Sequence, residues 1–353
     1  MTEDGRSMNC DADVVVVGAG PAGTAAAIWS ALSRLRVTLI ECSRFPRHRP
    51  GETLHPGAEC LLRQLGVLDR VSAACTVRHR AVSVDWAGRK AEQSFGEDSA
   101  GPWYGYQILR EELDRILIQR AAEAGVQVLQ PCLVDKPVIR DGRVCGIRHG
   151  GCLTSARLVI DATGSANWLR RRLRLHQMTA SPPMTASYGY CEGELSGATA
   201  NPSLCGDANG WIWTAMVGAR LFQWTRLSFH ENLAPTPPHS FSALRAQGKT
   251  RYSDVTWRCL EEPAGPGYLI AGDAAMVLDP ATSHGVLRAL MSGMMASHSA
   301  QQILAKQIDE WQAYVAYQNW LRTWFAHDVE RLSALYRQLD PQWPFFQASG
   351  AQP

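Results

Sequence analysis

The chain opens on its most regular pattern, a short apolar run that leads into glycines. Residues 13–17 read Asp-Val-Val-Val-Val, the next residues include Gly18, Gly20 and Gly23, and small residues follow over 24–29. This order predicts a strand, a tight turn and a helix, with G-x-G-x-x-G across the turn. The first glycine permits the turn, the second lets a pyrophosphate approach the backbone, and the third lets the helix lie close to the strand. The pattern therefore predicts a dinucleotide-binding unit.

The next apolar run, over residues 37–41, predicts a second strand that ends in an acid. Glu41 stands 18 residues after Gly23, where a carboxylate can accept hydrogen bonds from both ribose hydroxyls of an adenosine. The N–H groups around Pro21 and Ala22, at the positive end of the first helix, would hold the phosphates. These residues alone leave NAD and FAD both open.

Further along the chain, the apolar spacing alternates between helical and strand periods. Helices are predicted over 58–65, 107–123, 286–304 and 308–339, and strands over 82–86, 91–95, 126–134, 158–161 and 268–271. Asp141-Gly142 predicts a hairpin between two short β runs. From about 182 to 267 helical spacing fades, which predicts a mixed or antiparallel sheet suited to a substrate face, with β-like runs at 187–190, 211–216 and 221–226.

Two segments carry more ionisable or aromatic residues than packing alone requires. Residues 44–57 hold prolines, glycines and several ionisable side chains, which favours a binding loop over a solvated crossing. In the last helix, aromatic residues between Trp311 and Phe325 form a stripe. Such a stripe fits core packing or, alternatively, a docking surface for a protein partner.

Composition narrows the classes of function. The chain has 353 residues, which favours two interleaved domains over a single core. Its net charge is +2 without a long basic run, so a nucleic-acid partner has no electrostatic support. Ten scattered cysteines without C-x-x-C spacing argue against a metal site and predict reduced thiols in a cytoplasmic protein. The sequence contains neither a signal-peptide pattern nor an apolar run of the ~20 residues that a membrane span needs.

Four motifs occur in an order that resembles a known family. They are the glycine turn, Arg110 near a helix start, Asp161-Ala-Thr-Gly164 and Gly272-Asp273-Ala-Ala. This order resembles the superfamily of FAD-dependent hydroxylases that includes p-hydroxybenzoate hydroxylase, the flavin halogenases and the geranylgeranyl reductases. The resemblance covers nearly the whole chain. It implies FAD rather than NAD, because Gly272-Asp273 supplies an acid for the flavin ribityl chain.

The resemblance also implies which residues hold FAD. The helix that begins near Gly285 is expected to face the flavin pyrimidine and stabilise negative charge there. Arg49 and Arg110 are expected to pair with flavin phosphates, or else to form surface ion pairs. Besides the glycine turn and its helix start, the implied set is Glu41, Cys42, Arg49, Gly51, Glu52, Thr53, Arg110, Val134, Ala162, Thr163, Gly164, Gly272, Asp273, Pro280, Ser283, His284, Gly285 and Val286.

The expected fold class is α/β, with a Rossmann-like FAD-binding domain interleaved with a mixed or antiparallel sheet domain that binds substrate. A helical C-terminus completes it. The predicted FAD-binding domain takes residues 10–80, 104–180 and 266–305, the substrate domain takes 81–103 and 181–265, and the C-terminal helical segment takes 306–353.

Two finer motifs narrow the resemblance. Residues 47–56 and 278–285 are similar to the halogenase-like flavoproteins that mature tryptophylquinone cofactors, such as the partners of bacterial glycine oxidase and lysine oxidase. This implies hydroxylation of a tryptophan in a precursor quinoprotein oxidase, during cysteine tryptophylquinone biogenesis, through a flavin C4a-hydroperoxide. It also implies O2 and an external electron donor, which is NAD(P)H, reduced flavin or a reductase.

The chain departs from the halogenases at two points. Those enzymes need a lysine after the segment that matches 51–53, and here the first lysine is Lys90. They also carry W-x-W-x-I-P, of which Trp211-Ile-Trp213 supplies half, and both tryptophans equally fit core positions. Both departures predict a halogenase scaffold without halogenation.

Glu52, His55 and His284 are the candidate catalytic residues, because they are the titratable groups nearest the expected flavin face. A histidine could assist proton transfer to the peroxide or from the substrate ring, and each of the three could equally be structural. No metal ligand is predicted. The alternatives are a monooxygenase or halogenase-like enzyme for a free small aromatic, a reductase of isoprenoid type, and a non-enzymatic FAD-binding subunit.

Overall fold

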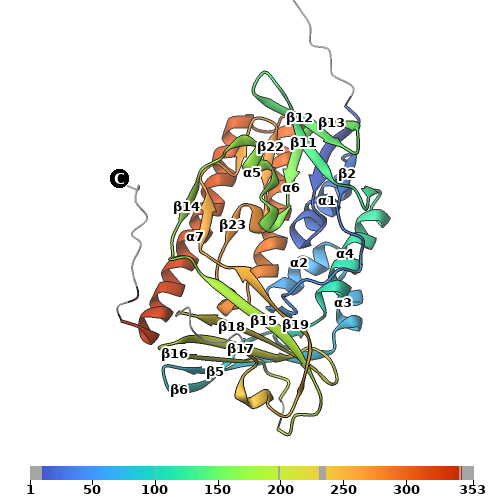
Figure 1. Cartoon of the computed structure of the whole chain (residues 1–353). Coiled ribbons are helices and arrows are strands. Elements are labelled where there is room, and N and C mark those ends of the chain that lie inside the picture. Colours follow the sequence, from blue (N-terminus) through green and yellow to red (C-terminus); the bar gives the residue numbers. More distant parts are fainter. Residues whose placement is uncertain (1–9, 100, 198, 230–235, 342, 344–353) are drawn as a thin grey trace, which may run out of the picture.

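Two large β-sheets lie in the upper and lower halves of the molecule, and one long helix runs beside both (Figure 1). The computed structural model describes residues 10–99, 101–197, 199–229, 236–341 and 343. The predicted C-terminal segment 306–353 therefore includes residues that lie outside the described part, namely 342 and 344–353.

The upper sheet has eight strands, and its central strands are parallel because both of their faces are buried. All four valines of the first run are less than 5% exposed. A long antiparallel hairpin, turning at Asp141-Gly142, extends one edge. The eight strands of the upper sheet are β1 (Ala12–Val17), β2 (Val37–Ile40), β10 (Gln127–Leu129), β11 (Val134–Arg140), β12 (Arg143–His149), β13 (Cys152–Asp161), β21 (Ala264–Gly265) and β22 (Tyr268–Ile270).

Two helices pack closely together against this sheet. They are α1 (Pro21–Leu32) and α6 (Gly285–Leu304). A Cβ atom on Gly293 would lie 2.1 Å from the Ala22 carbonyl oxygen, so this contact requires glycine. The hydroxyls of Ser30 and Ser297 meet across the same interface at 2.7 Å. This packing holds the start of α6 beside the glycine turn that precedes α1.

The lower sheet has seven strands and is antiparallel except where β16 pairs with β5. The predicted mixed or antiparallel sheet is therefore confirmed, as is the α/β fold class. The seven strands of the lower sheet are β5 (Ala81–Trp86), β6 (Arg89–Ser94), β15 (Thr185–Glu192), β16 (Ser203–Asp207), β17 (Gly210–Met216), β18 (Leu221–Ser228) and β19 (Arg245–Asp254).

Shorter elements join the two halves. Two small three-stranded sheets lie between them, one formed by β3 (Thr53–Leu54), β9 (Gly105–Gln107) and β4 (Val77–His79), and the other by β14 (Gln177–Thr179), β20 (Arg258–Leu260) and β23 (Met276–Val277). The remaining elements are α2 (Ala58–Gln64), α3 (Leu68–Ala74), α4 (Arg110–Glu123), α5 (Trp168–Leu173) and the pair β7 (Glu97–Asp98) and β8 (Gly101–Pro102).

Helix α7 (Glu310–Leu339) is hydrogen-bonded to both large sheets. The Tyr317 hydroxyl donates to the carbonyl of Ile270 in the upper sheet at 2.8 Å. Near the other end of the helix, the indole N–H of Trp86 donates from the lower sheet to the Leu335 carbonyl at 2.9 Å. The helix therefore fixes the two sheets relative to each other.

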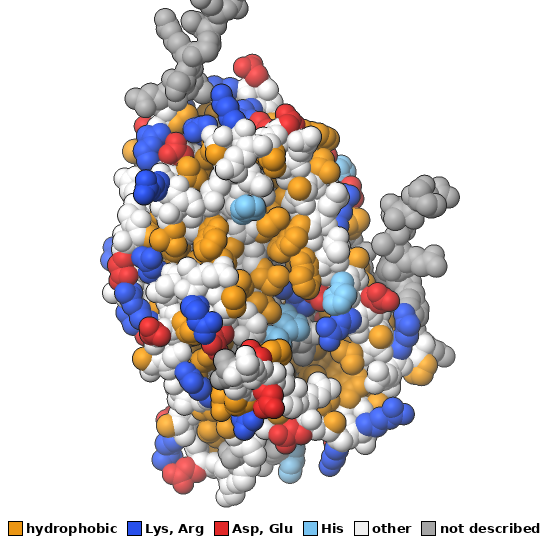
Figure 2. Space-filling view, turned by 180° about the vertical axis from the view of Figure 1, so that it is seen from behind, with side chains coloured by type: hydrophobic (Ala, Val, Ile, Leu, Met, Phe, Trp, Pro, Cys, Tyr) orange, Lys and Arg blue, Asp and Glu red, His pale blue; other side chains and the backbone are white. Residues whose placement is uncertain are grey.

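The aromatic stripe of α7 is divided between the core and the surface. Tyr314, Tyr317 and Phe325 are buried, whereas Trp311 is 69% exposed and Trp324 is 40% exposed. Core packing thus accounts for half of the stripe. Figure 2 shows hydrophobic side chains across the middle of the opposite face of the molecule, with histidine, lysine and arginine side chains beside a hollow below them.

Two predicted elements differ clearly from the structure. The helix expected from residue 107 begins at Arg110, because Gln107 closes strand β9. The strand expected over 126–134 is interrupted between β10 and β11, where Pro131 lacks the N–H that a sheet ladder needs. Helix α3 was not predicted. Within the described residues, no helix is long and apolar enough to cross a membrane.

Candidate functional site

The three glycines of the first turn face different surroundings. Gly18 has φ +98°, and a Cβ atom there would lie 2.5 Å from the Ala162 carbonyl oxygen. A Cβ on Gly23 would lie 1.8 Å from the Gly18 carbonyl oxygen. At Gly20 a Cβ would meet only the Arg47 guanidinium, at 3.6 Å. The first and third glycines are therefore required by the fold, whereas the second leaves its side of the turn open to a ligand.

Glu41 follows β2 and is held beside the glycine turn. One carboxylate oxygen accepts the backbone N–H of Ala19 at 2.8 Å, and the other accepts the N–H of Ser43 at 2.8 Å. The Cys42 thiol donates to the same second oxygen at 3.4 Å. The backbone of the turn thus orients a buried carboxylate next to the start of α1.

Arg47 is the cation that the structure places at the glycine turn. Its Nη1 atom lies 3.0 Å from Glu41, and its Nε atom lies 3.7 Å from Asp114, too far for a hydrogen bond. The Nε–H is buried and has no partner among the described residues, and burial lowers the pKa of the guanidinium. The end of the Arg47 guanidinium lies beside the open face of Gly20, where a cation fits a phosphate.

Sequence reasoning assigned the phosphate contact to Arg49 and Arg110, and did not name Arg47. In the structure Arg110 pairs with Asp114 at 3.1 Å and donates to the Pro50 carbonyl at 2.8 Å. Arg49 lines a cavity on the side of the lower sheet. The sequence offers several arginines in one loop, and spacing does not distinguish which of them turns toward the glycines.

Glu52 is fixed between the loop and the lower sheet. It accepts the Tyr190 hydroxyl at 2.5 Å and the backbone N–H of Gly51 at 2.9 Å. Burial raises the pKa of the Glu52 carboxyl, while its hydrogen bonds to Tyr190 and to backbone N–H groups oppose this. Burial and the neighbouring Glu52 also raise the pKa of Tyr190 far above its usual value. The two residues form one buried hydrogen-bonded acid pair.

A cavity of about 350 Å³ adjoins this acid pair. Its walls come from the binding loop, from the start of α4 and from the edge strand β19. His48 lies at its rim, with ring centroids 5.3 Å from Tyr190 in an edge-on arrangement. The cavity is lined among others by His48, Arg49, Glu52, Arg110, Tyr190, Lys249 and Arg251. Its size and mixed lining fit part of an aromatic ligand.

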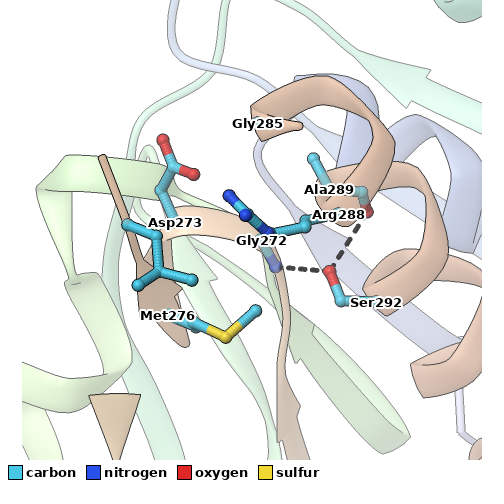
Figure 3. Close-up of a pocket in the computed structure, with 8 residues that line it drawn as sticks. Gly272, Asp273, Met276, Gly285, Arg288, Ala289 and Ser292 are labelled. Carbon is cyan, nitrogen blue, oxygen red and sulfur yellow. Dashed lines mark hydrogen bonds between the residues drawn. The ribbon is translucent and has the colours of Figure 1, made fainter. Parts of the chain in front are cut away.

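The second glycine turn, at Gly272-Asp273, lies next to the first, because a Cβ atom on Gly272 would lie 2.8 Å from the Cβ of Ala22. It lines a small pocket at the start of α6 (Figure 3). The region bordered by the two turns and the start of α6 is called the crevice below. The Gly272 N–H donates to the Ser292 hydroxyl of α6 at 2.9 Å, and Arg288 extends from α6 toward this turn. The Asp273 side chain is exposed. The protein around it still removes part of its hydration, which raises the pKa of the carboxyl, and the positive charges of Arg110, Arg258 and Arg288 lower it. A carboxylate that keeps part of its hydration is suited to accepting hydrogen bonds from hydroxyl groups.

The loop before α6 carries the last group of predicted residues. Asp279 is fully buried and accepts the N–H of Ala281 at 2.7 Å, which shapes the loop from Pro280. Ser283 has φ +53°, and His284 caps the helix that Gly285 and Val286 begin. The Val286 methyl would lie 3.7 Å from a Cβ on Gly51, so this loop and the 51–55 segment are neighbours.

His55 and His284 face each other across these two loops, with ring centroids 4.5 Å apart. Burial lowers the pKa of His55, and burial followed by the neighbouring His55 and two arginines lowers the pKa of His284 to about 3. His55 Nδ1 accepts the Gly57 N–H at 3.1 Å. Both imidazoles are therefore neutral near pH 7, and His55 carries its proton on Nε2.

The remaining predicted residues lie in two places, near the first glycine turn and in the small sheet of β3 and β9. Ala162, Thr163 and Gly164 follow β13, where Asp161 accepts the Thr163 N–H at 2.9 Å and the Ala162 carbonyl faces Gly18. Val134 begins β11, close to Cys132, whose N–H donates to the Glu41 carbonyl at 2.7 Å. Thr53, in β3, donates to Gln107 at 2.9 Å.

Comparison with known protein families finds two matches along the chain. Residues 11–135 match the family model described as an FAD binding domain, and residues 98–222 match the one described as tryptophan halogenase. The first covers the glycine turn, Glu41 and Arg47, and the second reaches across β17 into β18.

Several curated proteins are similar over most of the chain. A tryptophan 2-halogenase of Chondromyces crocatus is 28% identical over 86% of this chain, which spans 64% of that relative's length. A 1H-pyrrole-2-carbonyl-[peptidyl-carrier protein] brominase of Pseudoalteromonas luteoviolacea is 26% identical over 87% of this chain and 81% of its own length. A menaquinone reductase of Mycolicibacterium smegmatis is 26% identical, covering 82% and 76% of the two chains.

Solved structures share the fold. The myxobacterial chondrochloren halogenase CndH superposes with a TM-score of 0.85 at 22% identity, covering 97% of this chain and 86% of its own. PqsL, a probable FAD-dependent monooxygenase from Pseudomonas aeruginosa, gives a TM-score of 0.79 at 17% identity, with coverages of 94% and 97%. The arrangement of the two sheets and the C-terminal helices is thus common to halogenases and monooxygenases.

Proposed function

We propose that this chain, a member of the superfamily of FAD-dependent monooxygenases and halogenases, uses O2 to oxygenate a small aromatic substrate. It is an FAD-binding oxidoreductase, and the substrate and the type of product are the proposal. The observation that carries it is the crevice between the two glycine turns, beside which lie a buried acid pair and a cavity of about 350 Å³.

The residues of the crevice fit FAD. The open side of Gly20 and the guanidinium of Arg47 would hold the pyrophosphate, and Glu41 would hold the adenosine ribose. Asp273 would bind the ribityl hydroxyls, and the N-terminal end of α6 at Gly285 would face the flavin ring. Bound FAD supplies the activation of O2, which no side chain of this protein can perform.

The protein's own part is to position the substrate and to manage protons. Glu52 and Tyr190 form a buried hydrogen-bonded pair that can hold a proton at the cavity wall. His55 and His284, neutral near pH 7, can accept a proton at the opposite side, near the start of α6. Glu52 is buried, whereas Tyr190, His55 and His284 are half-buried, so these groups can lie beside a bound substrate.

The absence of a lysine just after residues 51–53 favours oxygenation over halogenation, although Lys249 lines the cavity beside Glu52. Lys90, the first lysine of the chain, lies on the exposed strand β6, where its ammonium is 3.9 Å from Asp85. Its amine is therefore tied to the surface of the lower sheet. The segment from 51 to 89 contributes no lysine to the crevice.

The test is a product assay on the FAD-loaded protein. The protein is reduced, mixed with O2 and either a phenol or an indole, and the products are analysed by mass spectrometry with and without bromide. The proposal predicts that one oxygen atom is added to the ring regardless of bromide. Formation of hydrogen peroxide alone with every ring offered would contradict it.

Halogenation is the second candidate, because the similar proteins named above include a tryptophan 2-halogenase and a brominase. The same assay decides between the two. A brominated ring that appears only with bromide would establish halogenation and would mean that another group replaces the missing lysine.

A finer hypothesis is that the aromatic ring is a tryptophan of a precursor quinoprotein oxidase. It rests on residues 47–56 and 278–285, and none of the relatives named above is a tryptophylquinone-maturing protein. Coexpression with such a precursor would raise the precursor's intact mass by one or two oxygen atoms. An unchanged mass, alongside an active product assay on free rings, would rule this partner out.

A further inference from the structure

The edge strand β19 bulges where it borders the cavity of about 350 Å³. Three residues of β19, 248–250, stand opposite Gly189 of β15 alone. Gly248 has φ +76°, which residues with a side chain rarely adopt, so the bulge depends on this glycine. Bulges at sheet edges redirect side chains and are common next to functional sites. Lys249 lies in this bulge, Arg251 follows it, and both line the cavity.

Three cations of this cavity have no counter-ion in the protein. Arg49 of the binding loop, Lys249 and Arg251 form neither a salt bridge nor a side-chain hydrogen bond within the described part of the chain. All three are exposed, so they lie at the mouth of the cavity. Arg245, on the same strand but outside the cavity lining, pairs with Glu192 at 2.8 Å. The cations that border the cavity are thus the ones left available to a ligand.

The carboxylates of the cavity wall do not neutralise these cations. The two oxygens of Glu52 are taken by the Tyr190 hydroxyl and by the backbone N–H of Gly51. Glu111 is the other carboxylate in the lining, and it is exposed. The fourth cation of the lining, Arg110, is already paired with Asp114. The mouth of the cavity therefore has a surplus of positive charge, which attracts an anion.

The number of free cations indicates which kind of anion fits. A carboxylate has one negative charge and two oxygens, and a single arginine can satisfy both oxygens. A terminal phosphate carries a charge of about −1.5 to −2 near pH 7 and offers three acceptor oxygens. Three cations from two separate elements match the phosphate better. Leu109 and Leu221, in the same lining, provide an apolar wall for a ring attached to that phosphate.

These cations are separate from the residues that fit the phosphates of FAD. The pyrophosphate of FAD fits the open side of Gly20, beside which the Arg47 guanidinium lies. Arg47 lies 3.0 Å from Glu41 there, whereas Arg49 lines the cavity next to the lower sheet. FAD also has no terminal phosphate, because both of its phosphates are linked on either side. The surplus of positive charge at the cavity is therefore suited to a second ligand.

We infer that Arg49, Lys249 and Arg251 bind the terminal phosphate of a second ligand whose ring enters the cavity. The inference rests on the proposed function, which requires an external electron donor and an aromatic substrate, and either of these can carry such a phosphate. Among the donors, NADPH and reduced FMN carry one, whereas NADH does not. We expect the donor to be the source, because a donor has to enter and leave in every cycle and the cavity is bordered by an exposed edge strand.

The test measures binding to the FAD-loaded protein by calorimetry, with oxidised donors so that no electrons are transferred. The probes form three pairs that differ only in a terminal phosphate: NADP⁺ with NAD⁺, FMN with riboflavin, and phenyl phosphate with phenol. In at least one donor pair the phosphate compound should bind about tenfold more tightly. This preference should largely disappear in Lys249→Gln and in Arg251→Gln, and should remain in Arg245→Gln on the same strand. A preference confined to phenyl phosphate would support the site and assign the phosphate to the substrate.

FAD content and thermal stability provide the check on folding. Both should stay unchanged in Lys249→Gln and Arg251→Gln, because these exposed side chains have no salt bridge or hydrogen bond to lose. Equal binding within every pair, a preference that survives in both variants, or a loss of FAD from them would overturn the inference. A phosphate preference in a protein that oxygenates no ring would support this site and refute the proposed function instead.

Discussion

At the scale of single residues, the glycines of the first turn have different roles, one of them in ligand binding and another in folding. A Cβ at Gly20 meets only the end of the Arg47 side chain, at 3.6 Å, whereas a Cβ at Gly23 would lie 1.8 Å from a backbone oxygen. We expect Gly20→Ala to leave the stability of the FAD-free protein within about 0.5 kcal/mol and to lower FAD affinity at least tenfold. Gly23→Ala should instead destabilise the protein itself.

Urea unfolding of both variants, combined with FAD titration, checks this pair. The contrast is the informative part, because both substitutions add the same methyl group three residues apart. If Gly20→Ala bound FAD as tightly as the wild type, the pyrophosphate would not approach this turn.

His79 gives a second prediction at this scale, in the pH dependence of stability. The pKa of His79 is about 4 in the folded protein, below the usual 6.5. Between these two values the imidazole is therefore protonated in the unfolded chain but neutral in the folded protein. Stability therefore falls as the pH is lowered from 6.5 toward 4, and His79→Leu should remove about 2 kcal/mol of the loss between pH 7 and pH 4.5.

The measurement is the difference in unfolding free energy between pH 7 and pH 4.5 for the wild type and the variant. His298→Leu, at an exposed position, serves as the control and should keep the wild-type difference. Equal acid sensitivity in wild type and His79→Leu would mean that His79 is solvated and not buried.

Residue identities near the site were only partly predictable. The glycine pattern and Glu41 are local signals, because a turn and a strand end fix them. Arg47 was missed, because the side chain that reaches the glycines depends on how the loop folds back over Asp114.

At the scale of elements, the end of α7 anchors the loop that precedes α6. The Tyr336 hydroxyl accepts the Trp211 indole N–H at 2.6 Å and donates to the carboxylate of Asp279. All three side chains are buried. One phenol thus connects α7, the lower sheet and the loop at Pro280, and Trp211 has a structural role.

Tyr336→Phe should therefore destabilise the protein by about 2–4 kcal/mol, because it leaves an indole N–H and a buried carboxylate without a partner. FAD affinity should fall as well, since Asp279 shapes the loop before Gly285. Denaturant unfolding and FAD titration measure both effects. The control is Tyr252→Phe, at a residue that is 62% exposed, and a loss as small as in this control would contradict the anchoring role.

Elements with a long periodic pattern were predicted from sequence, whereas short ones were not. The helices α6 and α7 and the strands β1 and β13 carry enough apolar residues at one spacing to be recognised. Strands β3, β4 and β9 have two or three residues each, too few to show a period. These short strands nevertheless position Thr53 beside Gln107, and strands of this length leave no pattern in the sequence.

At the scale of the whole molecule, the site exists because chain segments far apart in sequence converge. The crevice takes its walls from the first 55 residues, from the turn at Gly272 and from the start of α6, and the adjoining cavity takes one wall from β19. The order of motifs predicted this convergence through family resemblance. The division into domains at 81, 104, 181 and 266 stays a prediction.

The account depends most directly on FAD occupying this crevice. The decisive measurement is a titration of the purified FAD-free protein with FAD, followed by flavin fluorescence and thermal unfolding, with NAD as the comparison ligand. We expect one FAD to bind per chain and to raise the melting temperature, while NAD does neither. A protein that takes up no FAD, or that is stabilised by NAD instead, would contradict the central claim.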